Sequence, residues 1–138
     1  MHPARLSERE LLADCEIRTT RRSGPGGQHR NKVETAVVVR HRPTEIEAEA
    51  NEARSQAENR GRAIFRLRVK LALANRTEPD DAPSQLWQTR CSRGRIAVNP
   101  AHDDFPGLLA EALDVVAIHA GDVAAAATVL TCSSSQLT

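Results

Sequence analysis

The pattern of apolar and polar positions in the first half of the chain predicts a short helix, three strands and a long helix. Ser7 and Glu10 form a capping-box pattern, which predicts a helix that ends near Ala13. Three later segments alternate between apolar and polar residues or are rich in β-branched residues, and they predict strands over residues 15–19, 34–41 and 45–50. The second strand is the most apolar and is expected at the centre of the sheet. Local propensity leaves a helix as an alternative for the third segment.

The longest apolar stripe begins near Gln56. Its members recur with helical spacing: Ala57, Ile64, Leu67, Leu71 and Ala74. Much of the remaining helix surface is occupied by the cations Arg60, Arg62, Arg66, Arg68 and Lys70. We expect this helix to pack on the sheet rather than to form a membrane-binding or calmodulin-type surface, because the strands need a cover. The fold class predicted for residues 1–76 is therefore α+β, with a small and mostly antiparallel sheet packed against a long basic helix.

The second half of the chain predicts a linker followed by a small segment with a hairpin and helices. Residues 77–86 are assigned to the linker because they begin with a stretch rich in proline and acidic residues. Residues 87–138 form the C-terminal segment. A hairpin fragment is expected over residues 90–100, with a strand over residues 95–98 and with Trp87 as its anchor.

Two helices are predicted in the rest of this acidic segment. The first opens at residues 104–106, where a proline occupies an early helical position, and Gly121 ends it. Asp122 can cap the second helix, over residues 123–130. Residues 122–137 resemble the helix, turn and start of a second helix in a helix-turn-helix module. A plain helical hairpin is the alternative, and the acidity of the segment argues against strong binding to duplex DNA.

Charge is distributed unevenly along the chain, although the formal net charge is only +1. Residues 1–76 contain 16 Lys and Arg against 10 Asp and Glu, whereas residues 77–138 contain 3 against 8. Within residues 18–42, seven cations accompany the single acid Glu34. This excess is typical of a surface that meets a phosphate-rich partner, with a solvated basic face as the alternative.

Composition argues against a secreted, membrane or metal-binding protein. The three cysteines, Cys15, Cys91 and Cys132, lie far apart without the spacing of a metal site, and their odd number cannot pair completely. No apolar run approaches the length of a membrane span, and the first residues carry no signal segment. We therefore expect a cytoplasmic protein with reduced thiols, no metal and no membrane contact. We also expect a monomer without a cofactor.

The most distinctive segment of the chain runs from Ser23 to Lys32 and reads Ser-Gly-Pro-Gly-Gly-Gln-His-Arg-Asn-Lys. Gly26 and Gly27 have no Cβ, so their backbone can approach a reacting centre closely. Gln28 adds a neutral amide that can orient water or a ribose hydroxyl but cannot remove a proton near neutral pH. The segment lacks the spacing of a P-loop, and no acid is placed to complete a catalytic triad. Its predicted chemistry is positioning and oxyanion stabilisation.

This segment, continued by Val33-Glu34-Thr35 and followed by Arg54-Ser55-Gln56 and Asn59-Arg60, resembles the catalytic GGQ domain of class I peptide chain release factors and of release-factor-like ribosome-rescue proteins. The similarity covers roughly residues 14–75. It implies hydrolysis of the ester bond that joins a nascent peptide to tRNA, in the peptidyl transferase centre of the large ribosomal subunit.

The resemblance also implies a role for each matching residue. In the family, the motif glutamine admits and orients water, and its backbone amide stabilises the developing oxyanion. These roles correspond here to Gln28, while Gly26 and Gly27 provide the backbone shape. The family often carries N5-methylation on this glutamine, which makes Gln28 a candidate substrate of a methyltransferase.

The expected partners are the rRNA of the large ribosomal subunit and peptidyl-tRNA. The residues expected to contact rRNA or tRNA are Arg21, Arg22, Ser23, Gly24, Pro25, His29, Arg30, Asn31, Lys32, Arg54, Gln56, Asn59 and Arg60. For the last four of these, bracing of the loop is an equal alternative.

The sequence departs from the family in two ways. Only about 20 residues precede the loop, and no codon-recognition region can be placed, so we expect hydrolysis that is independent of the codon, as in ribosome rescue. The shorter rescue proteins carry a tail rich in lysine and arginine after the catalytic domain, whereas this chain has an acidic segment there. Two alternatives remain: a non-catalytic ribosome- or RNA-binding module whose loop grips rRNA, and a hydrolase of free peptidyl-tRNA.

Overall fold

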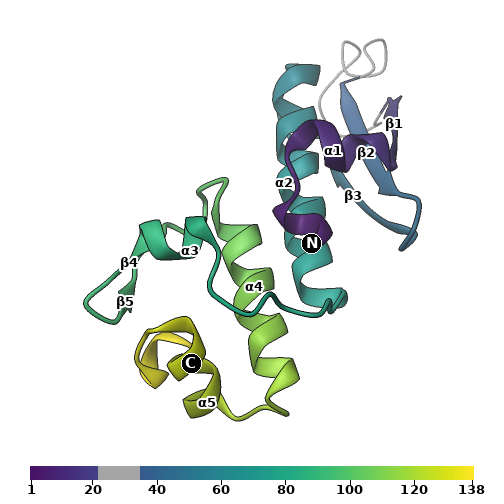
Figure 1. Ribbon diagram of the computed structural model, residues 1–138. Helices are drawn as coiled ribbons and strands as arrows, with labels where there is room; N and C mark the ends of the chain where they lie inside the picture. The colour runs from purple at the N-terminus through teal and green to yellow at the C-terminus, as the bar shows by residue number, and fades with distance from the viewer. Residues whose placement is uncertain (22–34) are drawn as a thin grey trace. The chain divides into compact units, whose positions relative to one another are not determined.

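The computed structural model of the 138-residue chain describes residues 1–21 and 35–138. The chain divides into two compact units (Figure 1). Unit 2 comprises Ser7–Lys70, and unit 1 comprises Met1–Leu6 together with Leu71–Thr138. The division into a catalytic domain, a linker and a C-terminal segment stays a prediction. In the described part of the chain, no helix combines the length and the apolar character needed to cross a membrane.

Unit 2 contains an antiparallel sheet with the strand order β1-β2-β3. Its strands are β1 (Cys15–Thr20), β2 (Ala36–His41) and β3 (Ile46–Ala50). The helix α1 (Glu8–Ala13) precedes the sheet, and its cap is the predicted one, because Ser7 Oγ accepts from the backbone N–H of Glu10 at 3.2 Å. The predicted α+β class and the antiparallel sheet are confirmed, and the helical alternative for the third strand is wrong.

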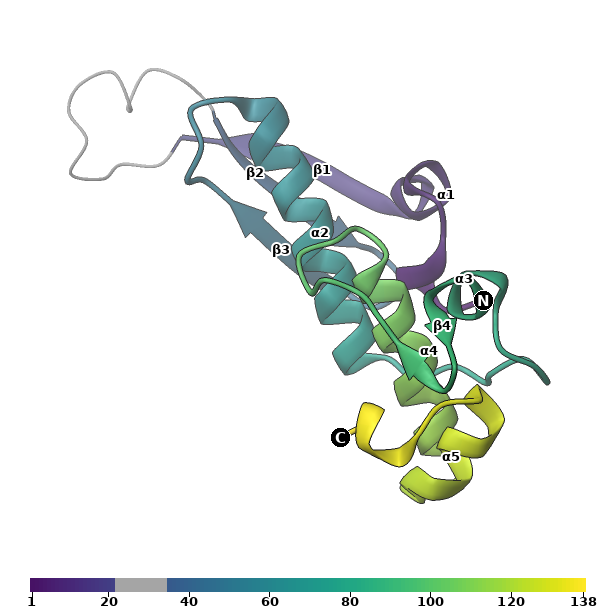
Figure 2. The same cartoon turned by 90° about the vertical axis from the view of Figure 1, so that its left-hand side faces the viewer.

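The core of unit 2 lies between the sheet and the helix α2 (Gln56–Ala74), which runs along one face of the sheet (Figures 1 and 2). Every residue of β2 from Ala36 to Val39 is buried, as expected of a β-branched central strand. From α2, the unit buries Ala63, Ile64 and Leu67, which belong to or adjoin the predicted apolar stripe.

Two cations of α2 contact the main chain of β3, which is an edge strand of the sheet. Lys70 Nζ donates to the carbonyl oxygen of Glu47 at 2.8 Å. The Arg66 guanidinium donates to the carbonyl oxygen of Glu49 at 2.9 Å. The basic face of α2 therefore satisfies backbone acceptors of an edge strand, in addition to being exposed to solvent.

Unit 1 is mostly helical. Its elements are η1 (Pro3–Arg5), α3 (Gln85–Arg90), β4 (Cys91–Ser92), β5 (Arg95–Ile96), α4 (Phe105–Ile118), α5 (Val123–Leu130) and η3 (Ser134–Gln136). The predicted hairpin is confirmed, with β4 and β5 joined by Arg93 and Gly94, whose φ values are 52° and 77°. Positive φ at both central residues is typical of a type I′ turn. The sequence prediction missed α3 and η1.

The core of unit 1 is centred on Trp87, which is 2% exposed. It packs in a cluster with Leu108, Val115, Ala126 and Leu130. The Trp87 indole nitrogen donates to the carbonyl oxygen of Leu130 at 2.8 Å. Trp87 thus joins α3 to the end of α5, a wider role than the hairpin anchor expected from the sequence.

Two buried carboxylates of α4 hold the segment between α2 and α3. Asp114 accepts from the backbone N–H of Thr77 at 3.0 Å and from its hydroxyl at 2.7 Å. Glu111 accepts from the backbone N–H of Ser84 at 2.7 Å and from its hydroxyl at 2.5 Å. Both ends of residues 77–84 are therefore anchored, although their composition is that of a linker.

Candidate functional site

The connection between β1 and β2 starts and ends at paired strand ends. Thr20, the last residue of β1, is the register partner of Ala36, the first residue of β2. Residues 22–34 lie outside the described residues. They include the predicted site residues Arg22, Ser23, Gly24, Pro25, Gly26, Gly27, Gln28, His29, Arg30, Asn31 and Lys32. The described part of the site is therefore the base of this connection and the elements that support it.

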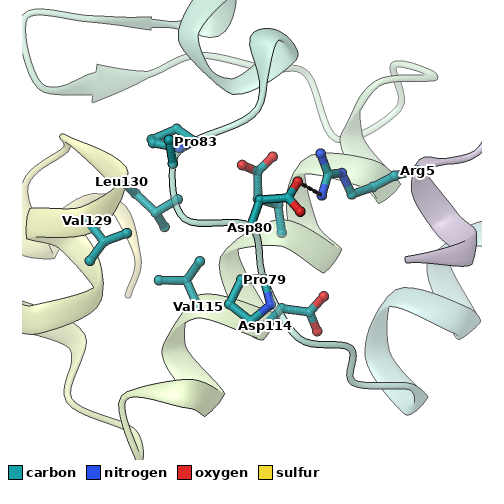
Figure 3. Close-up of a pocket in the computed structure, with 10 residues that line it drawn as sticks. Arg5, Pro79, Asp80, Pro83, Asp114, Val115, Val129 and Leu130 are labelled. Carbon is teal, nitrogen blue, oxygen red and sulfur yellow. Dashed lines mark ion pairs between the residues drawn. The ribbon is translucent and has the colours of Figure 1, made fainter. Parts of the chain in front are cut away.

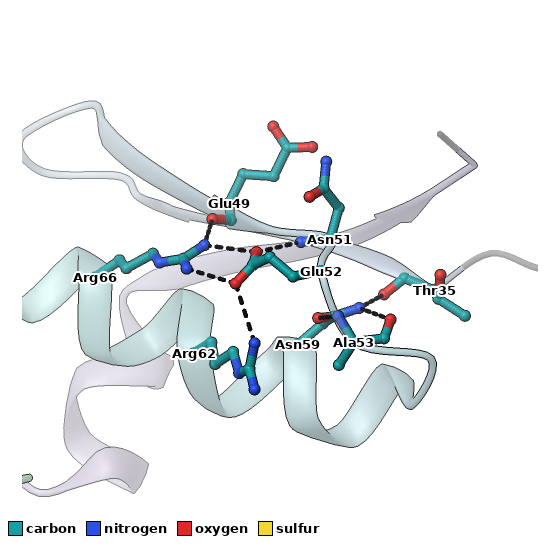
Figure 4. A network of polar contacts seen from close by, with 8 residues as sticks. All are labelled: Thr35, Glu49, Asn51, Glu52, Ala53, Asn59, Arg62 and Arg66. Carbon is teal, nitrogen blue, oxygen red and sulfur yellow. Dashed lines mark hydrogen bonds and ion pairs between the residues drawn. The ribbon is translucent and has the colours of Figure 1, made fainter. Parts of the chain in front are cut away.

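Asn59 supports the end of the connection at Thr35, the residue that precedes β2. Its side-chain nitrogen donates to the carbonyl oxygen of Thr35 at 2.7 Å and to that of Ala53 at 3.0 Å (Figure 4). Its side-chain oxygen accepts from the backbone N–H of Ala53 at 3.0 Å. Asn59 is 0% exposed. This placement favours bracing over direct RNA contact, the two alternatives that the sequence left open.

The beginning of α2 is fixed by a capping arrangement that the sequence prediction did not use. Ser55 Oγ accepts from the backbone N–H of Glu58 at 3.3 Å, and the Ser55 carbonyl oxygen accepts from the N–H of Asn59 at 3.1 Å. The pattern Ser-x-x-Glu is a capping-box signature that could have been found in the sequence. It fixes the first turn of α2, where Asn59 holds Thr35. The partial positive charge of a helix N-terminus thus lies beside one end of the connection.

Glu52 holds the segment between β3 and α2 through two arginines of α2. Its carboxylate accepts from Arg66 at 2.8 and 2.5 Å and from Arg62 at 3.2 Å (Figure 4). It also accepts from the backbone N–H of Asn51 at 2.9 Å. Hydrogen bonds from Arg66, and then from Asn51, hold the pKa of Glu52 well below its usual range. The hydrogen bond to Glu52 in turn raises the pKa of Arg66. Glu52 is part of the support that sequence reasoning missed.

The remaining predicted contact residues that the structure describes are exposed. Arg21 directly follows β1, whereas Arg54, Gln56 and Arg60 lie before or within the first turns of α2. The Arg60 guanidinium donates to Glu8 at 3.0 Å, and that ion pair is solvent-exposed. The structure therefore brings three of these exposed residues together with Asn59 at the start of α2 and places Arg21 at the other end of the connection.

Asn59 and Glu52 hold neighbouring segments in place and are not arranged as reactive groups. Asn59 is a neutral amide with both donor hydrogens and its acceptor oxygen engaged, and Glu52 is paired with cations. Neither has the arrangement of a nucleophile beside a base. The role that the structure supports for Asn59 and Glu52 is therefore to hold the segments beside the connection in place.

Unit 1 contains a small pocket lined by acidic and apolar side chains and by Arg5 (Figure 3). Asp80 lies at this pocket and forms an ion pair with Arg5 at 3.9 Å. Asp114, also in the lining, is bound to Thr77 and forms an ion pair with Arg76 at 2.8 Å. Since these carboxylates already have partners within the chain, their arrangement is explained by folding and indicates no ligand.

Comparison with known proteins shows similarity to release factors over most of the chain. A family model described as RF-1 domain matches residues 10–100. Peptide chain release factor 1 of Xylella fastidiosa (strain 9a5c) is 38% identical over 94 residues, which are 68% of this chain and 26% of that protein. The chain thus spans about a quarter of the length of the release factor it matches. The family match includes the three-stranded sheet, α2, α3 and the β4–β5 hairpin, and it ends before α4.

Proposed function

The chain belongs to the RF-1 domain family, and on that premise we propose that it hydrolyses the ester bond of peptidyl-tRNA on the ribosome without reading a codon. The observation that carries this proposal is the tripeptide Gly26-Gly27-Gln28, which lies inside the matched range on the connection between β1 and β2. The supported base of that connection is consistent with a loop that has to be placed accurately.

The proposed chemistry needs few groups from the protein. Water attacks the carbonyl carbon of the ester, negative charge develops on the carbonyl oxygen, and the tRNA ribose hydroxyl is the leaving group. Gln28 orients the water with its side chain and stabilises the oxyanion with its backbone N–H. Gly26 and Gly27 let the backbone approach the ester. Proton transfers are assigned to rRNA and to the tRNA ribose, because an amide cannot act as a base near neutral pH.

The proposed partners are the rRNA of the large ribosomal subunit and the acceptor end of peptidyl-tRNA, in the cytoplasm. Arg21, Arg54, Gln56 and Arg60 are exposed and can reach a partner, and in our proposal the cations among them contact phosphates. Asn59 is assigned a bracing role. Modification of Gln28 by a methyltransferase belongs to the same proposal.

The decisive experiment measures release of a labelled peptide from ribosomes that carry peptidyl-tRNA. Three types of ribosome are compared, with a truncated mRNA, a stop codon or a sense codon in the A site. The proposal expects release from all three types, or from the truncated mRNA complex alone. Release confined to the stop codon would contradict codon independence.

Variants separate catalysis from binding. Gln28→Ala is expected to lower release at least about a hundredfold, the cost of losing a placed group in such a site. Gln88→Ala is the matched control, because Gln88 is an exposed glutamine of unit 1 whose side chain donates to the Pro83 carbonyl oxygen. The control should release peptide at the wild-type rate. Equal release by Gln28→Ala and the wild type would refute the assigned role.

A non-catalytic ribosome- or RNA-binding module is the second candidate, and the excess of cations in residues 1–76 favours it. It predicts ribosome binding without release on any of the three complexes. Release from free peptidyl-tRNA in a reaction without ribosomes would instead indicate a hydrolase that does not need the ribosome.

A further inference from the structure

Two of the three cysteines meet in unit 1, although they are far apart in the sequence. Cys91 follows α3 and begins β4, and Cys132 follows α5. Cys91 Sγ lies 3.6 Å from the carbonyl oxygen of Thr131, which belongs to the peptide group bonded to Cys132. In a trans peptide this oxygen is about 2.8 Å from the next Cα, so Cys91 Sγ lies within about 6.4 Å of the Cα of Cys132. All three cysteines are free thiols in the structure.

The segments that carry the two thiols are tied together by hydrogen bonds on either side of them. The backbone N–H of Ser133 donates to the carbonyl oxygen of Gly94 at 3.0 Å. The backbone N–H of Ile96, the register partner of Cys91, donates to the side-chain oxygen of Gln136 at 3.2 Å. These bonds limit how far the β4–β5 hairpin can move from residues 131–136. The two thiols are therefore held near each other by the fold of unit 1.

The surroundings of the two thiols suit a reversible reaction. Both side chains are partly buried and pack against the Trp87 cluster, so neither is sealed in the core. Burial raises the pKa of Cys132, and the neighbouring Cys91 raises it further, so the attacking thiolate forms more readily at alkaline pH. In the part of the chain that the structure describes, no group of three or more metal-ligating side chains forms. It is the proximity of the two thiols that suits them to disulfide formation.

We propose that Cys91 and Cys132 are a modification site, a thiol pair that a small-molecule disulfide such as oxidised glutathione converts to an intramolecular disulfide. One thiolate of the pair attacks a sulfur of the oxidant and releases one glutathione thiolate. The second thiolate then attacks the mixed disulfide at the protein sulfur, forms the S–S bond and releases the second glutathione thiolate. The protein loses two electrons and two protons, and one oxidised glutathione becomes two reduced molecules.

The bond would join β4 to the segment after α5 and close the chain between residues 91 and 132. A cross-link reduces the number of conformations open to the unfolded chain, so the oxidised protein should be the more stable form. This inference does not depend on the proposed ester hydrolysis, because the thiols belong to unit 1 and the Gly26-Gly27-Gln28 tripeptide lies between two strands of unit 2.

The test incubates the whole 138-residue chain with oxidised glutathione at mildly alkaline pH, blocks the remaining thiols and maps the peptides by mass spectrometry. The expected product is a monomer that has lost two hydrogens, with Cys91 linked to Cys132 and Cys15 blocked. The thermal midpoint of the oxidised form should rise by roughly 5 °C or more, and a reductant should reverse the rise.

Matched variants define the pair. Cys15→Ser leaves both thiols of the pair in place and should form the same bond, whereas Cys91→Ser and Cys132→Ser should not. Peptide mapping of the wild type keeps the test decisive if a variant fails to fold. Products confined to glutathione adducts, disulfide-linked dimers or a bond that includes Cys15 would overturn the proposal. Unreacted Cys91 and Cys132 in the folded chain would overturn it as well.

Discussion

Replacement of Asn59 by alanine is expected to lower the free energy of unfolding by about 3 kcal/mol, because three hydrogen bonds of about 1 kcal/mol each are lost. The lost bonds join Asn59 to Thr35 and, twice, to Ala53. Asn59 is 0% exposed, so water cannot replace them without opening the structure. A loss of this size is a large part of the roughly 5–15 kcal/mol that stabilises a typical domain.

The assay is equilibrium unfolding in urea, followed by circular dichroism. Asn51→Ala is the matched control, because it removes an exposed asparagine side chain from the segment between β3 and α2 and should change stability by less than about 0.5 kcal/mol. Asn59→Asp tests the hydrogen bonds more specifically than alanine does. It keeps the size of the side chain and one acceptor, but it turns a carboxylate toward the carbonyl oxygens of Thr35 and Ala53. It should be at least as destabilising as alanine.

The Asn59 variants also test whether the hydrogen bonds of Asn59 position the connection between β1 and β2. In a single-turnover release assay with saturating protein, at a temperature where the variants are folded, Asn59→Ala should release peptide at least about tenfold more slowly, while ribosome binding changes little. A stability loss below about 1 kcal/mol, or an aspartate variant as stable as the wild type, would refute the bracing argument. Unchanged release by a destabilised variant would limit Asn59 to folding.

Three further predictions concern unit 1. Burial holds the pKa of His2 below its ordinary value of 6.5, so near that pH the unfolded chain binds more protons than the folded chain. The free energy of unfolding should therefore be highest above about pH 6.5 and should fall as the pH drops through that value. His2→Asn should reduce the difference between thermal midpoints at about pH 7.5 and about pH 5.5, with a remainder from His41, whose pKa burial also lowers. Trp87→Phe should cost about 1–2 kcal/mol in urea unfolding, because the Leu130 carbonyl loses its indole donor. Asp114→Ala should cost about 3 kcal/mol in the same assay, since it removes a buried acceptor and ion-pair partner.

Local patterns in the sequence were sufficient to predict most elements of unit 2. Alternation and β-branching gave the three strands, and the pair Ser7 and Glu10 gave the first helix. The family was also predicted from the sequence, and the match over residues 10–100 confirms it. The strand and helix predictions share a cause, because each of their signals lies within a short stretch of chain and does not depend on distant contacts.

Several features that depend on distant contacts were not predicted. Glu111 and Asp114 look like ordinary acids of an acidic segment, yet both are buried and hold residues 77–84. The first six residues belong to the same unit as the C-terminal half, which no local pattern can indicate. At the site, the excess of cations was visible in the sequence, but the burial of Asn59 depends on its contact with Thr35, 24 positions away. The roles assigned to residues 22–34 stay predictions.

The contacts between α2 and the edge strand β3 affect how charge mutants of this protein should be interpreted. Lys70 and Arg66 occupy carbonyl groups that would otherwise be available to a strand from another copy. Replacing both with neutral residues to test the proposed RNA binding would also expose that edge, and the expected outcome is self-association. A loss of ribosome binding in such a double mutant would then report aggregation rather than a missing phosphate contact. Arg54, which is exposed beside the loop base, is the better first substitution for mapping an RNA surface.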